Sequence, residues 1–446
     1  MAANFASNVA EKVMGHGDPS VTPDVANPSI DKSKYADPSG EKMQALAWFG
    51  KNDVRMVETF KPKVVDGRDV ILKVTGSTIC GSDRHLYHGS IIQLQKGDIL
   101  GHEFMGIVDS VGPAVRGIAV GDRAVASFQI ACGDCQFCKR KLSSMCEKTN
   151  ASTVENMMYG NRTAGMFGYS HFTGGFAGGQ AEYVRVPYGD VNLLKIPQGV
   201  SDEKALYLSD VLCTSYHCVV DTGVEKGDTV AVWGLGAVGL LACMWAFEKG
   251  ASRVIGVDNN WRLDYAKSKL PKLELLNFDE AKKGVSVAIN EMVPSGVDVA
   301  LECASGEFVK GYLHTVEMAL NLETDTSEIA NEMILSVKPF GKCGITGIYA
   351  GFTNHFNIGA IMEKGVRFIG NGQAPVHMYW EMILNDYIIP GKIDPLMVMT
   401  HRIDISDVAK AYRKFDNQEM GIEKVFVQTK FSSPPSAGAP QLTKID

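Results

Sequence analysis

Hydrophobic positions follow two different patterns along the chain. From Met43 the apolar residues come in short runs, MQALAWF, DVILKVTGSTIC and FMGIVDSVG, which glycine and aspartate separate. Short runs with turn residues between them are typical of strands in a β-barrel or sandwich. From about Asp210 the rhythm becomes strand, glycine turn and helix, repeated. This alternation predicts a parallel sheet covered by helices, so we expect an α/β chain with a separate β-rich part.

The same patterns divide the chain into five segments. Residues 1–42 are polar, with many proline, serine, aspartate and asparagine residues, and predict a disordered or loosely docked tail. Residues 43–209 carry the β-rich pattern, residues 210–372 carry the strand–helix pattern, and residues 373–431 return to a mixed pattern. The last segment, residues 432–446, is rich in serine and proline and predicts a flexible tail.

Composition and charge narrow the classes of function. The chain has 446 residues, 45% hydrophobic and 21% charged, which is an ordinary globular balance. Its net charge of -7 disfavours nucleic acid as a partner, and no apolar run reaches the roughly 20 residues of a membrane-spanning helix. The first forty residues contain neither an apolar signal segment nor an arginine, so we expect a cytoplasmic protein. Because thiols stay reduced there, the ten cysteines are expected to bind metal or to serve chemistry.

Four cysteines lie close together in one segment. Cys132, Cys135, Cys138 and Cys146 have the spacing C-x2-C-x2-C-x7-C. Four thiolates complete the tetrahedral shell of zinc and leave no position for a substrate. The segment therefore predicts a structural zinc site that holds a loop in place. An iron–sulfur cluster also takes four cysteines and is the alternative.

A second set of potential metal ligands is spread along the chain. Cys80 stands in ICGSDRH after a strand-like run, and His102 and Glu103 stand in LGHEFMG before the next one. A thiolate, an imidazole and a carboxylate suit zinc, and a catalytic zinc takes three protein ligands and keeps one position exchangeable. In the segment LSDVLCTSYH, both Asp210 and Cys213 are candidates for the third ligand.

The segment DTVAVWGLGAVGLLACMWAFEKGA is typical of a dinucleotide-binding strand, turn and helix. Gly234, Gly236 and Gly239 form G-x-G-x-x-G in its turn, where glycines permit the bend and the close approach of a pyrophosphate. The next strand-like run, RVIGVD, ends in Asp258, at the spacing of an acid that binds the ribose hydroxyls. This arrangement predicts NAD as the cofactor, and Arg262 close by keeps NADP as the alternative.

In their order along the chain, these motifs resemble the zinc-containing medium-chain alcohol dehydrogenase family, from about Met43 to Phe431. The resemblance implies a GroES-like β-barrel catalytic domain and a Rossmann domain with a doubly wound parallel sheet. A narrower resemblance is to the glutathione-independent formaldehyde dehydrogenase and dismutase branch. It is carried by TGGFAGGQAEYVRVPYGDVNLLKIP, LSDVLCTSYH and GNGQAPV.

The resemblance also implies roles for single residues. In the narrower branch the aspartate of the Leu-Ser-Asp stretch binds zinc, which makes Asp210 the expected third ligand beside Cys80 and His102. The other implied roles are a proton relay (Ser82 and His85), an acid beside the zinc (Glu103), a nicotinamide contact (Thr214), a pocket wall (Phe128) and a cation for the pyrophosphate (Lys424).

Taken together, the resemblance implies a dehydrogenase with two zinc ions per chain, one catalytic and one structural. It would transfer hydride between an alcohol, or an aldehyde hydrate, and NAD, and it would be a homodimer or homotetramer. A polyol or amino-alcohol dehydrogenase of the same family is one alternative, and a redox-inactive relative kept as a binding or structural protein is another. Residues 320–331 look inserted, and the loop from Gly160 to Gly179 is similar to one that covers the cofactor in the narrower branch.

Overall fold

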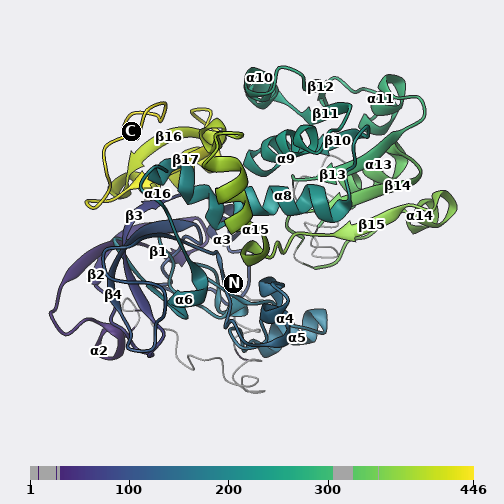
Figure 1. Ribbon diagram of the computed structural model, residues 1–446. Coiled ribbons are helices and arrows are strands. Elements are labelled where there is room, and N and C mark those ends of the chain that lie inside the picture. The colour runs from purple at the N-terminus through teal and green to yellow at the C-terminus, as the bar shows by residue number, and fades with distance from the viewer. Residues whose placement is uncertain (1–8, 10–26, 28–30, 305–324, 350, 446) are drawn as a thin grey trace. The chain divides into compact units, whose positions relative to one another are not determined.

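The computed structural model divides the chain into two compact units (Figure 1). The first unit comprises Met1–Asp210 and Pro375–Asp446, and the second comprises Val211–Ala374. The structure describes residues 9, 27, 31–304, 325–349 and 351–445. Most of the predicted N-terminal tail and part of the predicted insertion therefore lie outside the described residues. None of the described helices is long and apolar enough to cross a membrane.

A seven-stranded sheet forms the centre of the first unit. Its strand order is β16-β17-β3-β4-β5-β9, and β8 also pairs with β3. All of these pairings are antiparallel except that of β16 with β17. The strands are β3 (Val70–Ser77), β4 (Phe104–Val111), β5 (Arg123–Ala126), β8 (Tyr183–Val186), β9 (Leu193–Lys195), β16 (Met399–Asp404) and β17 (Lys424–Gln428). The return segment after the second unit thus supplies two strands of the same sheet.

Two small antiparallel pairs complete the β-structure of the first unit. They are β1 (Lys42–Gly50) with β2 (Asp53–Phe60), and β6 (Gln129–Ile130) with β7 (Gly165–Met166). Its helices are short and lie in the connections: α2 (Lys32–Tyr35), α3 (Asp83–Tyr87), α4 (Gln136–Lys139), α5 (Thr153–Tyr159), α6 (Gly189–Asn192), α7 (Asp202–Ala205), α15 (Val376–Ile383) and α16 (Val408–Asp416). The loop that holds α4 and α5 separates β6 from β7.

The second unit is a parallel sheet of six strands in the order β12-β11-β10-β13-β14-β15. The strands are β10 (Thr229–Trp233), β11 (Arg253–Asp258), β12 (Glu274–Asn277), β13 (Val297–Glu302), β14 (Val337–Ile345) and β15 (Arg367–Gly370). The described helices are α8 (Val211–Thr222), α9 (Ala237–Glu248), α10 (Asn260–Lys269), α11 (Val285–Met292), α13 (Glu328–Ser336) and α14 (Ile358–Lys364). Together with the first unit, this sheet confirms the predicted α/β fold class.

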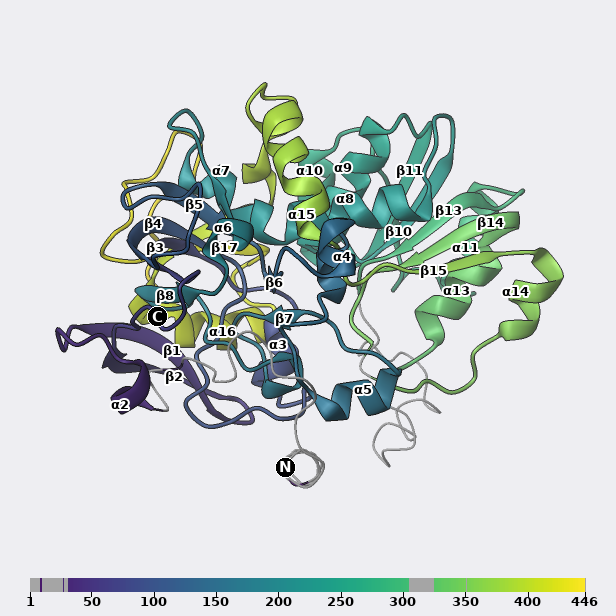
Figure 2. The same cartoon turned by 60° about the horizontal axis from the view of Figure 1, so that its bottom comes forward.

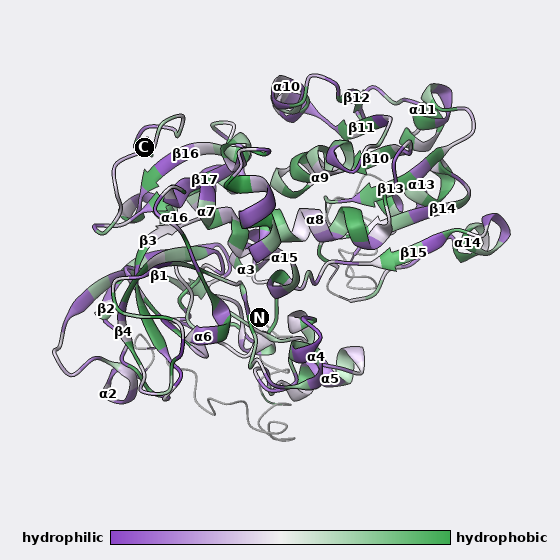
Figure 3. Cartoon of the chain, viewed as in Figure 1, coloured by the Kyte–Doolittle hydropathy of each residue, from purple (hydrophilic) through white to green (hydrophobic). Residues whose placement is uncertain are grey.

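Helices cover both faces of this sheet (Figure 2): α8 and α9 lie on one side, and α11 and α13 on the other. Strands enclosed in this way need apolar side chains on both faces. Accordingly Val230, Ala231 and Val232 of β10 are all fully buried. Figure 3 shows the same apolar character along β13 and on α9. The sequence pattern that alternates strand and helix therefore reflects a sheet buried between two helix layers.

The two predicted tails differ from the structure where it describes them. In the N-terminal segment, Lys32–Tyr35 form α2, and Ala36 pairs with Pro62. At the C-terminus, residues 432–445 pack on the first unit, and the predicted flexible tail is wrong for them. The side chain of Ile445 is fully buried, and the backbone N–H of Thr443 donates to the carbonyl of Arg402 over 2.7 Å. A buried apolar side chain and hydrogen bonds to the first unit thus hold a segment whose composition predicts disorder.

Candidate functional site

The four cysteines of the predicted structural site converge in the first unit. The ligand atoms of Cys132, Cys135, Cys138 and Cys146 all lie within 4.8 Å of one another. The segment places them by local turns: Cys135 caps α4, which contains Cys138, and Cys146 ends a 3-10 turn over Ser143–Met145. Because the four positions are close in sequence, the loop can bring them together without help from distant segments.

The thiols of this cluster have the surroundings of metal-bound thiolates. Backbone N–H groups of Asp134 and Cys135 donate to the sulfur of Cys132 over 3.4 Å, and the N–H of Cys132 donates to Cys146 over 3.3 Å. Hydrogen bonds from Cys132 and Cys138 lower the pKa of Cys146 to about 3, and the same grouping raises the pKa of Cys138. Without a cation, the thiol of Cys146 therefore ionises easily, and the neighbouring Cys138 stays protonated. A divalent ion would relieve this conflict, so the donor set fits zinc.

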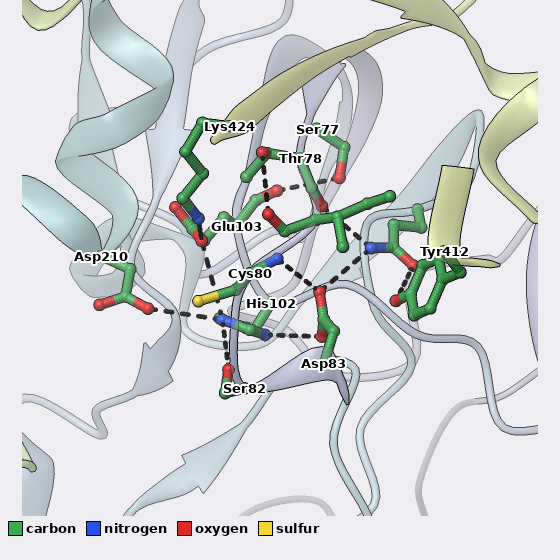
Figure 4. Close-up of polar contacts among 12 residues, drawn as sticks. Ser77, Thr78, Cys80, Ser82, Asp83, His102, Glu103, Asp210, Tyr412 and Lys424 are labelled. Atoms are coloured by element: carbon green, nitrogen blue, oxygen red, sulfur yellow. Dashed lines mark hydrogen bonds and ion pairs between the residues drawn. The ribbon is translucent and has the colours of Figure 1, made fainter. Parts of the chain in front are cut away.

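A second cluster brings together residues from three separate parts of the sequence (Figure 4). Cys80 follows β3, His102 and Glu103 directly precede β4, and Asp210 follows the 3-10 turn over Leu206–Ser209. One ligand atom from each of the four lies within 4.8 Å of the others. Each of these residues was singled out from the sequence, and the structure brings all of them together.

The two ring nitrogens of His102 have different surroundings: Nδ1 faces the carboxylate of Asp83, and Nε2 faces the other potential ligands. Its Nδ1 lies 3.3 Å from Oδ1 of Asp83, and neither atom has another hydrogen-bond partner among the described residues. Its Nε2 faces Asp210 Oδ2 at 3.4 Å and the Ser82 hydroxyl at 3.4 Å. A carboxylate at Nδ1 keeps the proton there and leaves the Nε2 lone pair free for a metal. The donors of this cluster therefore fit zinc as well.

Glu103 and Lys424 form a buried ion pair beside this cluster. Both side chains are fully enclosed, and the second carboxylate oxygen of Glu103 has no hydrogen-bond partner in the described part of the chain. Burial raises the pKa of Glu103, although Lys424 acts to lower it. The resemblance implied that Lys424 is a cation for a pyrophosphate, and in the structure its ammonium has a carboxylate partner within the first unit. This partner was missed because Glu103 and Lys424 are 321 positions apart.

The structure separates the two candidates for the third ligand. Asp210 belongs to the cluster, with Oδ2 facing His102. Cys213 belongs to neither of the two clusters of potential metal ligands in the described part of the chain. It is fully buried on α8. This placement favours Asp210.

Two aromatic side chains contact His102 of this cluster in the first unit. Phe128, the predicted pocket wall, has its ring centroid 6.2 Å from that of His102 in an edge contact. Tyr169 makes a similar edge contact at 5.3 Å and was missed from the sequence. Burial raises the pKa of Tyr169, against the opposing effects of His102 and a hydrogen bond with Ser82. The sequence pointed to Tyr169 only through its position in the glycine-rich loop. His85, the predicted outer residue of the proton relay, is buried on α3.

The glycine turn of the second unit has the geometry that its motif predicts. Gly234 has a φ of +87°, and a Cβ there would lie 2.9 Å from Ala304. A Cβ on Gly239 would lie 1.8 Å from the carbonyl oxygen of Gly234, so only glycine fits. Gly236 caps the N-terminus of α9, where free N–H groups and the helix dipole favour an anion.

Asp258 lies at the end of β11, beside this turn. Its Oδ2 accepts from the N–H of Leu235 inside the turn over 2.5 Å, and its Oδ1 accepts from the N–H of Asn259 over 2.8 Å. The carboxylate is therefore fixed next to the glycine turn, where the ribose of a dinucleotide would lie. Arg262 lies on α10, with its guanidinium 5.4 Å from the ring centroid of Trp261, and Thr214 is buried on α8.

Comparison with known proteins identifies the first unit. The family described as "Alcohol dehydrogenase GroES-like domain" matches residues 66–198. The chain is 39% identical to a zinc-type alcohol dehydrogenase-like protein of Schizosaccharomyces pombe, over 95% of this chain and 98% of the relative. It is 31% identical to the glutathione-independent formaldehyde dehydrogenase of Pseudomonas aeruginosa, over 86% of this chain and 96% of the relative.

A solved structure extends the likeness to the whole fold. The alcohol dehydrogenase from Thermus sp. ATN1 matches with a TM-score of 0.71 at 29% identity, covering 87% of this chain and all of the other. The predicted resemblance, including the formaldehyde dehydrogenase-like branch, and the predicted pairing of GroES-like and Rossmann domains are thereby confirmed.

Proposed function

Because this chain belongs to the zinc-containing medium-chain alcohol dehydrogenases, we propose that Cys80, His102 and Asp210 hold the catalytic zinc of an NAD-linked oxidoreductase for small aldehydes and alcohols. Zinc-dependent oxidoreduction of alcohols or aldehydes is the activity of the family. The observation that carries the assignment to this site is the convergence of the three ligands with Glu103 within 4.8 Å. Zinc, when bound, supplies a Lewis acid that polarises an alcohol or carbonyl oxygen.

The residues around the metal ligands would direct the proton. The Ser82 hydroxyl lies 3.4 Å from Nε2 of His102, so it is placed to donate to a substrate oxygen at the ligand cluster or to accept from it. We propose that Ser82 removes the proton of an alcohol or of an aldehyde hydrate and passes it outward through His85. Lys424 neutralises Glu103 beside the ligands, so the cluster carries less negative charge than its two carboxylates and one thiol suggest.

We further propose NAD rather than NADP as the cofactor, which accepts or returns the hydride. The support is Asp258, whose carboxylate is fixed beside the glycine turn by two backbone N–H groups. A carboxylate in this position accepts hydrogen bonds from the ribose 2′-hydroxyl and repels a 2′-phosphate. Arg262 lies next to Trp261 on the following helix, and its guanidinium is a feature that would favour the phosphate.

The substrate we propose is a small aldehyde or alcohol, formaldehyde included. The rings of Phe128 and Tyr169 both make edge contacts with His102, so aromatic side chains flank the ligand cluster, which suits a small substrate better than a polyol with several hydroxyl groups. The formaldehyde dehydrogenase relative supports the same size class.

The test is the initial rate on a panel of alcohols, polyols and aldehydes, with and without added NAD. We expect the highest kcat/KM on one- or two-carbon substrates, with NADH formed. Highest activity on a polyol would refute the size class. Conversion of formaldehyde into methanol and formate without added NAD would identify a dismutase that retains its cofactor. No turnover of any substrate, in a chain that binds two zinc ions, would refute the enzyme assignment.

Three further properties are part of the proposal. We propose a second zinc at the four cysteines, for two zinc ions per chain.

We propose a homo-oligomer, a dimer or tetramer, because the edge strand β15 and its surroundings expose Phe340 (82%), Ile358 (71%) and Met362 (73%). The cytoplasm is the proposed compartment, because all ten cysteines are among the described residues and none forms a disulfide.

A further inference from the structure

We infer that Gln180 and Tyr412 are positioning residues for the catalytic metal site: they hold the Asp83 carboxylate that orients His102. The inference rests on the zinc site proposed above. Neither residue belongs to the ligand cluster, and Tyr412 comes from α16 in the return segment, 232 positions after Gln180.

Asp83 is the link between this pair and the metal ligands. Its side chain is fully buried, and each of its oxygens serves one ligand. Oδ1 lies 3.3 Å from Nδ1 of His102, and Oδ2 accepts from the backbone N–H of Cys80 over 2.9 Å. Figure 4 shows Asp83 between His102 on one side and Tyr412 on the other. A shift of this carboxylate would therefore disturb two ligands at once.

Gln180 supplies a further donor to this carboxylate. Its Nε2 donates to the carbonyl of Thr78 over 2.9 Å and lies 3.4 Å from Oδ2 of Asp83. Its Oε1 accepts from the hydroxyl of Tyr412 over 2.9 Å. A flipped amide would direct its oxygen at two acceptors, a carbonyl and a carboxylate, and would leave the phenol without an acceptor there. The three contacts therefore fix a single orientation of the amide.

Burial makes this orientation costly to lose. Gln180, Tyr412, Asp83 and His102 are all at most 2% exposed, so water cannot replace a lost partner. Burial also raises the pKa of Tyr412, which keeps the hydroxyl protonated and able to donate. Removal of that hydroxyl would leave the Gln180 oxygen unpaired and free the amide to rotate away from Asp83.

The backbone positions Gln180 against the ligand loop independently of these side-chain contacts. Its N–H donates to the carbonyl of Leu100, and its carbonyl accepts from the N–H of Leu46. Gly101, the residue before His102, has a φ of +96°, and a Cβ there would lie 2.4 Å from Cγ of Gln180. The chain thus has glycine at a position where a side chain would push Gln180 away from the His102 loop.

The experiment compares Tyr412→Phe and Gln180→Met with Tyr87→Phe. Tyr87 is a matched control because it lies in the same hydrophobic cluster as Tyr412, with the ring centroids 5.8 Å apart, and loses the same atom. The readouts are the zinc affinity of the catalytic site, by competition with a chelator, and the visible spectrum after cobalt(II) replaces that zinc. Both are measured on the full-length protein with the four-cysteine site filled.

Partners of metal ligands are typically worth 10- to 100-fold in metal affinity, so we expect Gln180→Met to weaken zinc binding by about tenfold. Tyr412→Phe should weaken it by roughly three- to tenfold and shift the cobalt bands, whereas Tyr87→Phe should change neither. Because both residues act through one amide, Tyr412→Phe should have no further effect in the Gln180→Met background.

Wild-type affinity and spectrum in both variants, or an equal shift in Tyr87→Phe, would overturn the inference. Should Tyr412→Phe fail to fold, Gln180→Met decides by the same two readouts. A wild-type protein that binds only one zinc per chain would instead refute the proposed catalytic site, so the two failures can be told apart.

Discussion

At the scale of single residues, the proposed zinc ligands illustrate how one carboxylate would change the chemistry of a metal site. Asp210 stands where a neutral or thiolate ligand would also bind zinc, and its Oδ2 faces Nε2 of His102 at 3.4 Å. A Cys/His/Asp set has one thiolate fewer than a Cys2His set, so the metal should be a stronger Lewis acid. Whether Asp210 or Cys213 is the third ligand therefore affects the reactivity of the metal as well as the geometry of the site.

Replacement of Asp210 by alanine should remove one of two zinc ions per chain. Two protein ligands do not form a stable catalytic site, whereas the four-cysteine site is untouched. Metal content after dialysis measures this, and we expect about one zinc per chain together with loss of activity. Cys213→Ala is the matched control and should retain both ions. The assignment is wrong if Cys213→Ala is the variant that loses zinc.

Replacement of Ser82 by alanine should reduce turnover by about 100-fold or more, the usual contribution of a positioned proton-transfer group. NAD binding should stay within twofold, because the Ser82 hydroxyl faces His102 in the first unit. Steady-state kinetics and the fluorescence of bound NADH measure the two effects. Ser82→Thr keeps a hydroxyl and should restore most of the rate. Equal losses of rate and NAD affinity would contradict the relay role.

At the scale of elements, short local structures in this chain carry buried polar groups that set their stability. In α5, the buried carboxylate of Glu155 accepts from Asn150 over 2.6 Å and from the hydroxyl of Thr163 over 2.8 Å. In the second unit, the turn between β10 and α9 is so tight that a Cβ on Gly239 would overlap the carbonyl oxygen of Gly234. We therefore expect a change of one atom at Glu155 or at Gly239 to alter the stability or the shape of the element that contains it.

The stability of the α5 segment should depend on pH through Glu155. Burial raises the pKa of Glu155 from 4.5 to about 7. A raised pKa in the folded state gives stability that is complete below about pH 4.5 and is lost as the pH rises through 7. Glu155→Gln should remove this loss and be more stable than the wild type at pH 8, by up to about 3 kcal/mol, but not at pH 5.

Thermal unfolding and limited proteolysis at pH 5 and pH 8 measure this difference. Glu58→Gln is the control, because the side chain of Glu58 is exposed on β2. A constant difference between wild type and Glu155→Gln across this range would show that the carboxyl is ionised throughout.

The turn between β10 and α9 should not tolerate a Cβ at Gly239. In Gly239→Ala the new atom would lie 1.8 Å from the Gly234 oxygen, so the turn must open and the phosphate cradle is lost. We expect NADH affinity to fall by at least tenfold in a fluorescence titration. Gly370→Ala is the control, because nothing lies within 4 Å of a Cβ at that position in the same unit. Unchanged affinity in Gly239→Ala would place the cofactor elsewhere.

At the scale of the whole molecule, the first unit is completed by the chain's last residues. Arg402 of β16 is fully buried, pairs with Glu203 over 2.6 Å and also donates to the carbonyl of Ser433. The N–H of Ser436 donates to the same glutamate over 3.1 Å. The segment after Phe431 thus covers a buried ion pair that would be costly to expose or to leave half-paired.

This packing predicts a sharp contrast between two neighbouring apolar residues. The side chain of Ile445 is 0% exposed, whereas that of Leu442 is 54% exposed. Ile445→Ala should cost about 2–4 kcal/mol of stability in the first unit, the usual price of a large-to-small change in a core. Leu442→Ala should stay within about 0.5 kcal/mol. Chemical denaturation followed by a probe in the first unit measures both, and equal effects would show that the C-terminal segment is free in solution.

The sequence by itself determined the features that depend on neighbours along the chain. The four cysteines lie within 15 residues of one another, and the glycine turn spans six, so their spacing alone predicts a metal site and a dinucleotide-binding turn. The alternation of buried strands and helices likewise follows from local hydrophobicity, which is why the α/β class was predictable.

Only the tertiary structure decided the surroundings of the proposed zinc ligands. Lys424 reaches Glu103 across 321 positions, and Tyr412 reaches Gln180 across 232. Neither pair leaves a pattern in the sequence, because a buried polar side chain is specified by what the fold brings against it. The C-terminal segment shows the same limit: its composition predicts a free tail, but the buried Ile445 and hydrogen bonds with Arg402 and Glu203 hold it in place. Contacts between residues far apart in the sequence thus determine the partners of buried polar side chains and the position of the C-terminal segment, which local composition cannot predict.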